Sequence, residues 1–162
     1  MSKKRLIVGA LLSAALITLI GFRLLTSERA SAVLTLSCRA NVHFSITQNA
    51  AVTTMDGQIS LTTLGESRLA LQFSGQMMTP EGRFLLNRIL MMNYRYHPEN
   101  QALELNYSHS NVSETDTVPD SVFYQRLLKN DALLLYLQRF NPHSWLVSGL
   151  NMPLYLCTDR GG

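Results

Sequence analysis

The sequence lacks the short motifs by which most enzymes can be identified. It has no Gly-x-Ser-x-Gly, no glycine-rich phosphate-binding loop and no paired carboxylates in an apolar setting. Its four histidines, His43, His97, His109 and His143, are scattered, and none has the partner four residues away that a helical zinc site needs. We therefore expect no catalytic, cofactor-binding or metal-binding residues, and a protein that is not an enzyme.

Cysteine is scarce as well, because the chain has only Cys38 and Cys157. Neither lies in a Cys-x-x-Cys motif or has a histidine or cysteine at ligand spacing, which argues against a redox active site and a metal site. In an oxidising compartment, two such cysteines are more often paired than free; the alternative is two buried thiols. A bridge between them would close a loop of about 120 residues and stabilise the fold by about 4–5 kcal/mol.

Runs of like charge and low-complexity tracts are also absent. The formal net charge is +3. Once the charges that flank the N-terminal apolar segment are set aside, nine basic and ten acidic residues remain. This nearly neutral balance does not provide a nucleic-acid-binding surface, so we expect no direct contact with nucleic acid.

One long hydrophobic run is present, Leu6–Leu25. Its twenty residues span roughly 30 Å as a helix, which is the thickness of the hydrocarbon core of a bilayer. Lys3, Lys4 and Arg5 precede it, and positive charge at this end favours a cytoplasmic N-terminus. We expect residues 1–5 to be cytoplasmic, 6–25 to be a transmembrane anchor in contact with membrane lipid, 26–32 to be a linker, and 33–162 to be an exported domain.

A cleaved signal peptide is the competing interpretation, because Ala30-Ser31-Ala32 has the form of a cleavage site. However, the apolar run is longer than the usual signal-peptide core, and charged residues separate it from that site. An uncleaved anchor is the preferred interpretation.

The exported part has the alternating pattern of half-buried strands. Cys38, Ala40, Val42, Phe44 and Ile46 fall on one face of the first strand, with polar residues between them. Strands are expected over residues 33–47, 58–64, 67–78, 83–97, 102–108, 144–150 and 152–158, with turns at 56–57, 79–82 and 98–101 and a loop at 109–121.

Two further segments follow this loop. A short helix is expected over Val122–Asn130, capped by Asp120 or Ser121. Ala132–Phe140 is either a buried strand or a continuation of that helix. The expected fold class is mainly β: an N-terminal transmembrane helix followed by a small antiparallel β-barrel or sandwich with one short helix. A Cys38–Cys157 bridge would join the first strand to the last.

Other residue types leave functional alternatives open. The exported part has six methionines, which either fill the core or line a site for varied apolar ligands. His97 and His109 flank one expected strand and could lie within reach of one another, although surface histidines are the simpler interpretation.

Three segments together carry a family resemblance: the basic N-terminus with the anchor Leu6–Leu25, the stretch Tyr94–Tyr107 and the ending Trp145–Cys157. In these the chain resembles the FidL-like membrane proteins of enterobacteria. The resemblance implies a single-pass protein of the bacterial inner membrane with a periplasmic domain, encoded beside a membrane-bound, ToxR-like transcription regulator. It also implies that the small protein shields or tunes the periplasmic domain of the regulator and, in some cases, helps to form a pocket for a small apolar signal.

The expected function is therefore that of a non-enzymatic, membrane-anchored periplasmic accessory protein that binds and stabilises or tunes a ToxR-like membrane transcription regulator. Contact would be made by a sheet edge or an apolar patch. The alternatives are a periplasmic sensor or carrier of a small apolar ligand, bile-salt-like or lipid-like, and a structural envelope subunit.

Overall fold

The structure is a computed structural model that describes residues 34–48, 50–128, 131–150 and 152–159. The expected anchor Leu6–Leu25 and the linker after it lie outside these residues. None of the helices in the described ranges has both the length and the apolar character that a membrane crossing requires. Residues Ala32–Gly162 form one compact unit.

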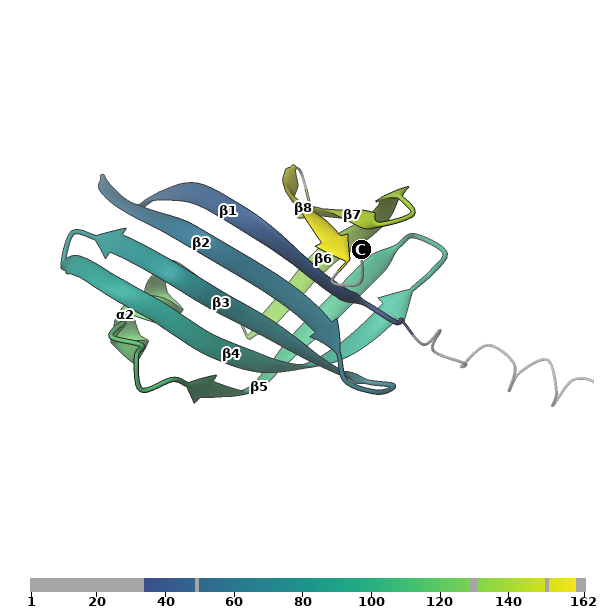
Figure 1. Ribbon diagram of the computed structural model, residues 1–162, viewed down its shortest axis with the longest axis horizontal. Helices are drawn as coiled ribbons and strands as arrows, with labels where there is room; N and C mark the ends of the chain where they lie inside the picture. The colour runs from purple at the N-terminus through teal and green to yellow at the C-terminus, as the bar shows by residue number, and fades with distance from the viewer. Residues whose placement is uncertain (1–33, 49, 129–130, 151, 160–162) are drawn as a thin grey trace, which may run out of the picture. The chain divides into compact units, whose positions relative to one another are not determined.

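Eight strands and one helix make up the described part (Figure 1). In chain order they are β1 (Ser37–Gln48), β2 (Ala51–Thr63), β3 (Arg68–Thr79), β4 (Gly82–His97), β5 (Ala102–Val112), α2 (Asp120–Arg126), β6 (Ala132–Asn141), β7 (Ser144–Ser148) and β8 (Pro153–Asp159).

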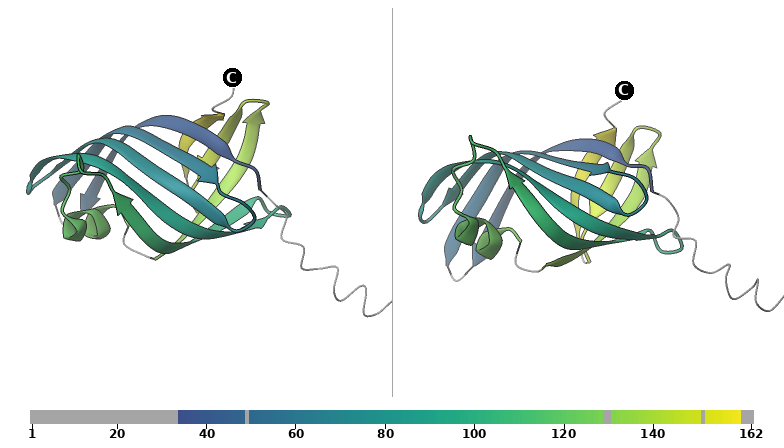
Figure 2. Two further views of the ribbon diagram at one scale, coloured as in Figure 1. Left: turned by 60° about the horizontal axis from the view of Figure 1, so that its bottom comes forward. Right: turned by 90° about the horizontal axis from the view of Figure 1, so that it is seen from below.

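The strands form a closed antiparallel barrel in which each pairs with the next and β8 returns to β1. Figure 2 shows the long strands β1–β5 wrapping around one side and the shorter β6–β8 around the other. The predicted mainly β class with one short helix is confirmed, and of the two architectures considered the barrel is present. Ala132–Phe140 was expected to be either a strand or a continuation of the helix, and it belongs to the strand β6.

Period-two patterning explains why this sequence closes into a barrel, since alternate side chains of each strand point inward. The predicted inner face of β1 is confirmed, with Cys38 and Ala40 buried and Val42 and Phe44 packed against the core. Each of the other strands adds apolar residues at alternate positions, and Leu61, Leu69, Leu90, Leu103 and Val147 are fully buried.

The predicted turn at Asp56-Gly57 is wrong, because β2 runs straight through both residues. Asp56 pairs across the sheet with His43, and Gly57 pairs with Gly75 on β3. A Cβ on Gly57 would collide with the carbonyl oxygen of Ser74. The glycine therefore serves a close approach of two strands, where local sequence alone indicates a hairpin.

Two boundaries also differ from the prediction. The loop expected from residue 109 begins later, since β5 continues to Val112. The helix begins at Asp120 and ends at Arg126, with Pro119 at its N-cap and no capping side chain, so the predicted cap at Asp120 or Ser121 is wrong. Asp120 lies in the first turn, where its charge suits the helix dipole, and its carboxylate binds Arg88.

Candidate interaction site

The barrel is closed unevenly where its first and last strands meet. In the described part of the chain, β1 and β8 pair at Cys38↔Asp159 and Arg39↔Thr158 and at no further position. By contrast, β1 pairs with β2 along its full length, from Ser37↔Thr62 to Gln48↔Ala51. We use the word seam for the stretch in which residues 41–46 of β1 and residues 154–156 of β8 lie on either side of one cavity without pairing.

A disulfide fixes the paired end of the seam. Cys38 and Cys157 are joined, with their Cα atoms 5.4 Å apart, and both residues are fully buried. The predicted pairing, and its place between the first and last strands, are therefore confirmed. The disulfide therefore closes one end of the seam covalently, and beyond it β1 and β8 are no longer paired.

A cavity of about 670 Å³ opens at the seam. Its walls are mainly apolar, and they come from both faces of β1, from β2, β3 and β8, from the connection before β8 and from the residue that follows α2. The apolar and aromatic lining residues are Val42, Phe44, Ile46, Ile59, Phe73, Leu127, Met152, Leu154, Tyr155 and Leu156. This volume is in the range of sites for small organic ligands. A second hollow of about 470 Å³, lined by polar residues such as Arg39 and Asn41, borders the seam.

Tyr155 places a phenol in this apolar wall. Burial raises the pKa of its hydroxyl above the ordinary value, so the group stays protonated and can donate a hydrogen bond. Asn41, His43 and Ser45 are the other polar residues of the lining.

The outer side of the seam is apolar too. Leu154 and Leu156 point outward from β8 and are 50% and 43% exposed, and Leu150 and Met152, in the connection before β8, are 70% and 64% exposed. Apolar side chains gathered beside an unpaired strand edge are typical of a surface that is covered by a partner.

Helix α2 covers the far end of the barrel, at which the β3–β4 turn lies (Figures 1 and 2). Its Phe123 is fully buried and packs edge-on against Phe73, with ring centroids 5.8 Å apart. Arg126 binds Glu81 of the β3–β4 turn at 2.9 Å. Because Phe73 lines the cavity, the position of the helix sets the shape of the cavity wall.

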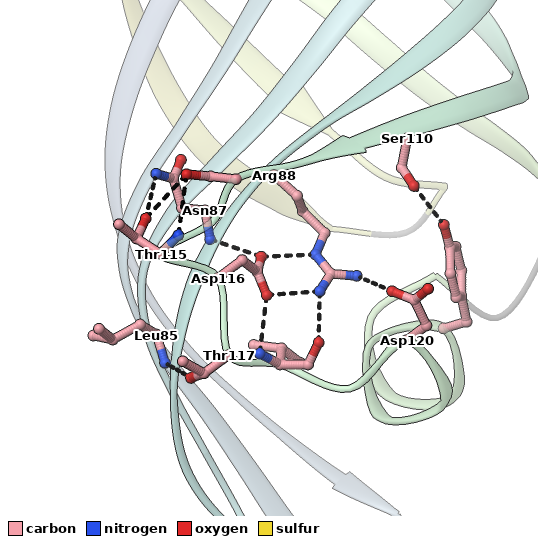
Figure 3. Close-up of polar contacts among 11 residues, drawn as sticks. Leu85, Asn87, Arg88, Ser110, Thr115, Asp116, Thr117 and Asp120 are labelled. Carbon is pink, nitrogen blue, oxygen red and sulfur yellow. Dashed lines mark hydrogen bonds and ion pairs between the residues drawn. The ribbon is translucent and has the colours of Figure 1, made fainter.

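A buried ion pair holds the segment that leads into this helix (Figure 3). Arg88 points inward from β4, and its Nη2 and Nε donate to the two carboxylate oxygens of Asp116 at 2.7 and 2.9 Å. It also donates to Asp120 and to the carbonyl oxygen of Val118, and its guanidinium lies 4.3 Å above the ring of Phe123.

The two charges stabilise one another electrostatically. Burial disfavours the charged form of Asp116, but hydrogen bonds from Arg88 and from the main-chain N–H groups of Asn87 and Val118 outweigh it, and they hold the pKa of the carboxyl below its usual value. Burial likewise opposes the charge on Arg88, and the two aspartates nevertheless raise its pKa. Because Arg88 and Asp116 are both paired, this cluster has a structural role.

Of the two interpretations of His97 and His109, the alternative that they lie within reach of one another is excluded. His97 ends β4 and pairs with Ala102 at the start of β5, whereas His109 lies near the other end of β5, opposite Met91. His43 contacts Asp56 on the exposed outer face, and His97 lies 3.1 Å from Glu104. No cluster of histidine, cysteine or acidic side chains in the described ranges could hold a metal ion.

Some methionines fill the core, which is one of the two predicted roles, and the binding of varied apolar ligands stays a prediction. Met55, Met77 and Met92 are buried in the core, whereas Met152 lines the cavity and is exposed. The Arg88 cluster was not predicted from the sequence. The signal in the sequence was Arg88, a charged residue on the inner face of an otherwise apolar strand. Its partner Asp116 lies in a distant loop and could not be identified from the strand pattern.

Comparison with known proteins supports the resemblance noted in the sequence. The profile of the family described as FidL-like putative membrane protein matches residues 75–157, which is just over half of the chain and spans β4 to β8 with α2. No curated protein matches the chain. The chain belongs to the family of FidL-like putative membrane proteins.

Proposed function

We propose that this protein is a non-enzymatic, membrane-anchored periplasmic accessory protein, and that it binds and stabilises a ToxR-like membrane transcription regulator. The observation that carries the proposal is the seam. A barrel normally leaves no strand edge free, yet here β1 beyond Arg39 runs without a partner on its β8 side in the described residues.

The free edge fits an extended segment of a partner. Unpaired main-chain N–H and C=O groups in a row accept another strand by sheet extension, and side-chain pockets then select the sequence. Inward positions such as Val42 and Phe44 would meet apolar side chains of the partner, and outward positions such as Asn41 and Ser45 would meet polar ones. The exposed leucines of β8 would add apolar contact on the outside.

Anchoring in the inner membrane supports this function energetically. Two proteins held in the same membrane meet at a raised effective concentration, so a modest contact area can give a lasting complex. The expected anchor Leu6–Leu25 would provide this for the present chain, with the N-terminus cytoplasmic and the barrel periplasmic.

Co-purification tests the proposal. The full chain with a C-terminal affinity tag, extracted from membranes in mild detergent, should retain a protein that has a winged-helix domain and one membrane span. Leu154→Asp beside the seam should reduce the retained regulator at least about 10-fold, because a charge in the contact is costly. Leu85→Asp is the matched control, since Leu85 on β4 is likewise 50% exposed and lies away from the seam. Equal retention by the two variants, or no regulator at all, would count against the proposal.

A second candidate function is favoured by the cavity itself. A cavity of about 670 Å³ with mainly apolar walls, the phenol of Tyr155 and the polar residues Asn41, His43 and Ser45 suits a small molecule, bile-salt-like or lipid-like, that is largely apolar and carries a hydrogen-bond acceptor. Because the same seam borders the cavity, such a ligand and a regulator segment would influence one another. The protein would then be the sensor of the pair as well as its stabiliser.

A further inference from the structure

We infer that the Cys38–Cys157 disulfide is a redox-controlled latch: it holds the unit β6–β8 against β1, and its reduction releases this unit while β1–β5 stay paired. The consequence for regulator binding rests on the proposed function, whereas the release itself does not.

The strand pairing divides the barrel into a strongly and a weakly joined part. β2 and β3 pair from Thr54↔Met78 to Thr63↔Leu69, and β3 and β4 pair over a similar length. The unit β6–β8 is joined to β5 over the shorter stretch Ala102–Asn106, and to β1 at the two positions beside the disulfide. Without the S–S bond, the main-chain ladder between β8 and β1 in the described residues consists of those two positions.

The remaining contacts around the latch keep β6–β8 together as a unit. Asp159 donates its main-chain N–H to the carbonyl oxygen of His143, and its carboxylate lies 3.5 Å from Arg139. Arg139 in turn stacks over Trp145, at 4.4 Å from the ring centroid. All of these join the end of β8 to β6, to β7 and to the turn between them, and none of them reaches β1. Separation of β8 from β1 therefore leaves these contacts intact.

The chemistry requires a dithiol reductant of the thioredoxin class. One of its thiolates attacks a sulfur of the bridge, which forms a mixed disulfide and frees the other cysteine as a thiolate that takes up a proton. The second thiolate of the reductant then displaces the remaining cysteine. The net result is two cysteine thiols on this protein and one disulfide on the reductant, with two electrons and two protons transferred.

Burial sets the rate of this exchange. Both cysteines are fully buried, so attack has to wait until the ladder positions at Asp159 and Thr158 separate. A regulator segment seated in the seam would slow this step. In the oxidised protein the two edges are held at a fixed spacing, which pre-organises the binding site; in the reduced protein this spacing is lost.

Hydrogen exchange on the full chain in detergent tests the release without any partner. Amides of the β1–β8 ladder, in residues 38–39 and 158–159, should exchange about 100-fold faster after treatment with tris(2-carboxyethyl)phosphine, while amides of residues 54–92 stay within about 3-fold of the oxidised protein. The double variant Cys38→Ser/Cys157→Ser should show the reduced pattern and no response to the reductant. Reoxidation of the wild type should restore protection.

Unchanged protection of residues 38–39 and 158–159, or an equal loss of protection over residues 54–92, would overturn the inference. Regulator retention is measured on the same samples and should fall at least about 10-fold on reduction. If even the oxidised protein retains no regulator, the proposed function fails. The hydrogen-exchange pattern then still shows whether reduction releases β6–β8 from β1. If hydrogen exchange shows the selective release but oxidised and reduced protein retain the regulator equally, the claim that the disulfide controls regulator binding is overturned.

Discussion

Arg88 and Asp116 form a two-pronged ion pair inside the barrel, and neither side chain has any exposed surface. Arg88 belongs to β4, and Asp116 lies in the segment between β5 and α2. The pair thus fixes the approach to the helix that closes one end of the barrel (Figure 3).

Removal of the carboxylate should be costly. Asp116→Ala leaves a buried guanidinium with fewer partners, and we expect a loss of about 3–5 kcal/mol in the free energy of unfolding. Asp120→Ala is the control, because that side chain is 71% exposed and its pair with Arg88 should contribute no more than about 1 kcal/mol. Urea unfolding of both variants measures the difference. Similar losses would contradict the assigned importance of Asp116.

The same pair should make stability depend on pH. The pKa of Asp116 is lowered in the folded protein from an ordinary value of 3.8, so the ionised carboxylate favours folding. This contribution is fully present well above pH 3.8 and is lost as the pH falls from there through the folded pKa. The difference in unfolding free energy between wild type and Asp116→Ala should therefore be constant from about pH 5 to 7 and shrink below about pH 4. A difference that does not change down to pH 3 would contradict this assignment.

Gly75 is expected to tolerate no side chain. Its φ is +153°, and a Cβ there would collide with the carbonyl oxygen of Asp56 on β2. Gly75→Ala should cost at least about 2 kcal/mol. Gly149→Ala is the matched control, because the nearest atoms would be 3.9 Å from its Cβ, and it should change stability by less than about 1 kcal/mol. Thermal unfolding of the two variants compares them; equal midpoints would show that the strands can separate at Gly75 without cost.

Filling the cavity should block a ligand without unfolding the barrel. Val42→Trp places an indole in the space that Val42 lines, whereas Val112→Trp adds one at a position that is 48% exposed and outside the lining. Native mass spectrometry of the full chain with deoxycholate as the probe should detect one bound molecule for wild type and for Val112→Trp. Binding to Val42→Trp should be at least about 10-fold weaker. Equal binding by both variants would place the ligand elsewhere.

The strands and their faces could be predicted from the sequence because period-two alternation is a local signal. The alternation around Cys38 and Phe44 indicated the inner face of β1, and the distant cysteines indicated that the first and last strands meet. Local signals failed where a contact across the sheet decides the conformation. Asp56-Gly57 has the sequence of a turn, but it lies within a strand because Gly57 packs against Gly75.

The candidate site was less accessible to sequence analysis for the same reason. An unpaired edge depends on how two strands lie relative to one another. No single residue of β1 or β8 indicates from the sequence that the two strands stay unpaired. The alternation along β1 continues through residues 41–46 as though a partner were present. The chain is patterned for burial there, whereas the described residues supply no paired strand on the β8 side.

Site-specific crosslinking in living cells tests the account most directly. Leu156, on the β8 side of the seam, is replaced by p-benzoylphenylalanine, and Leu85 on β4 is replaced in the same way in a second strain. We predict that illumination joins position 156, and not position 85, to a membrane regulator with a winged-helix domain and one membrane span. A regulator captured equally from both positions, or from neither, would contradict the account.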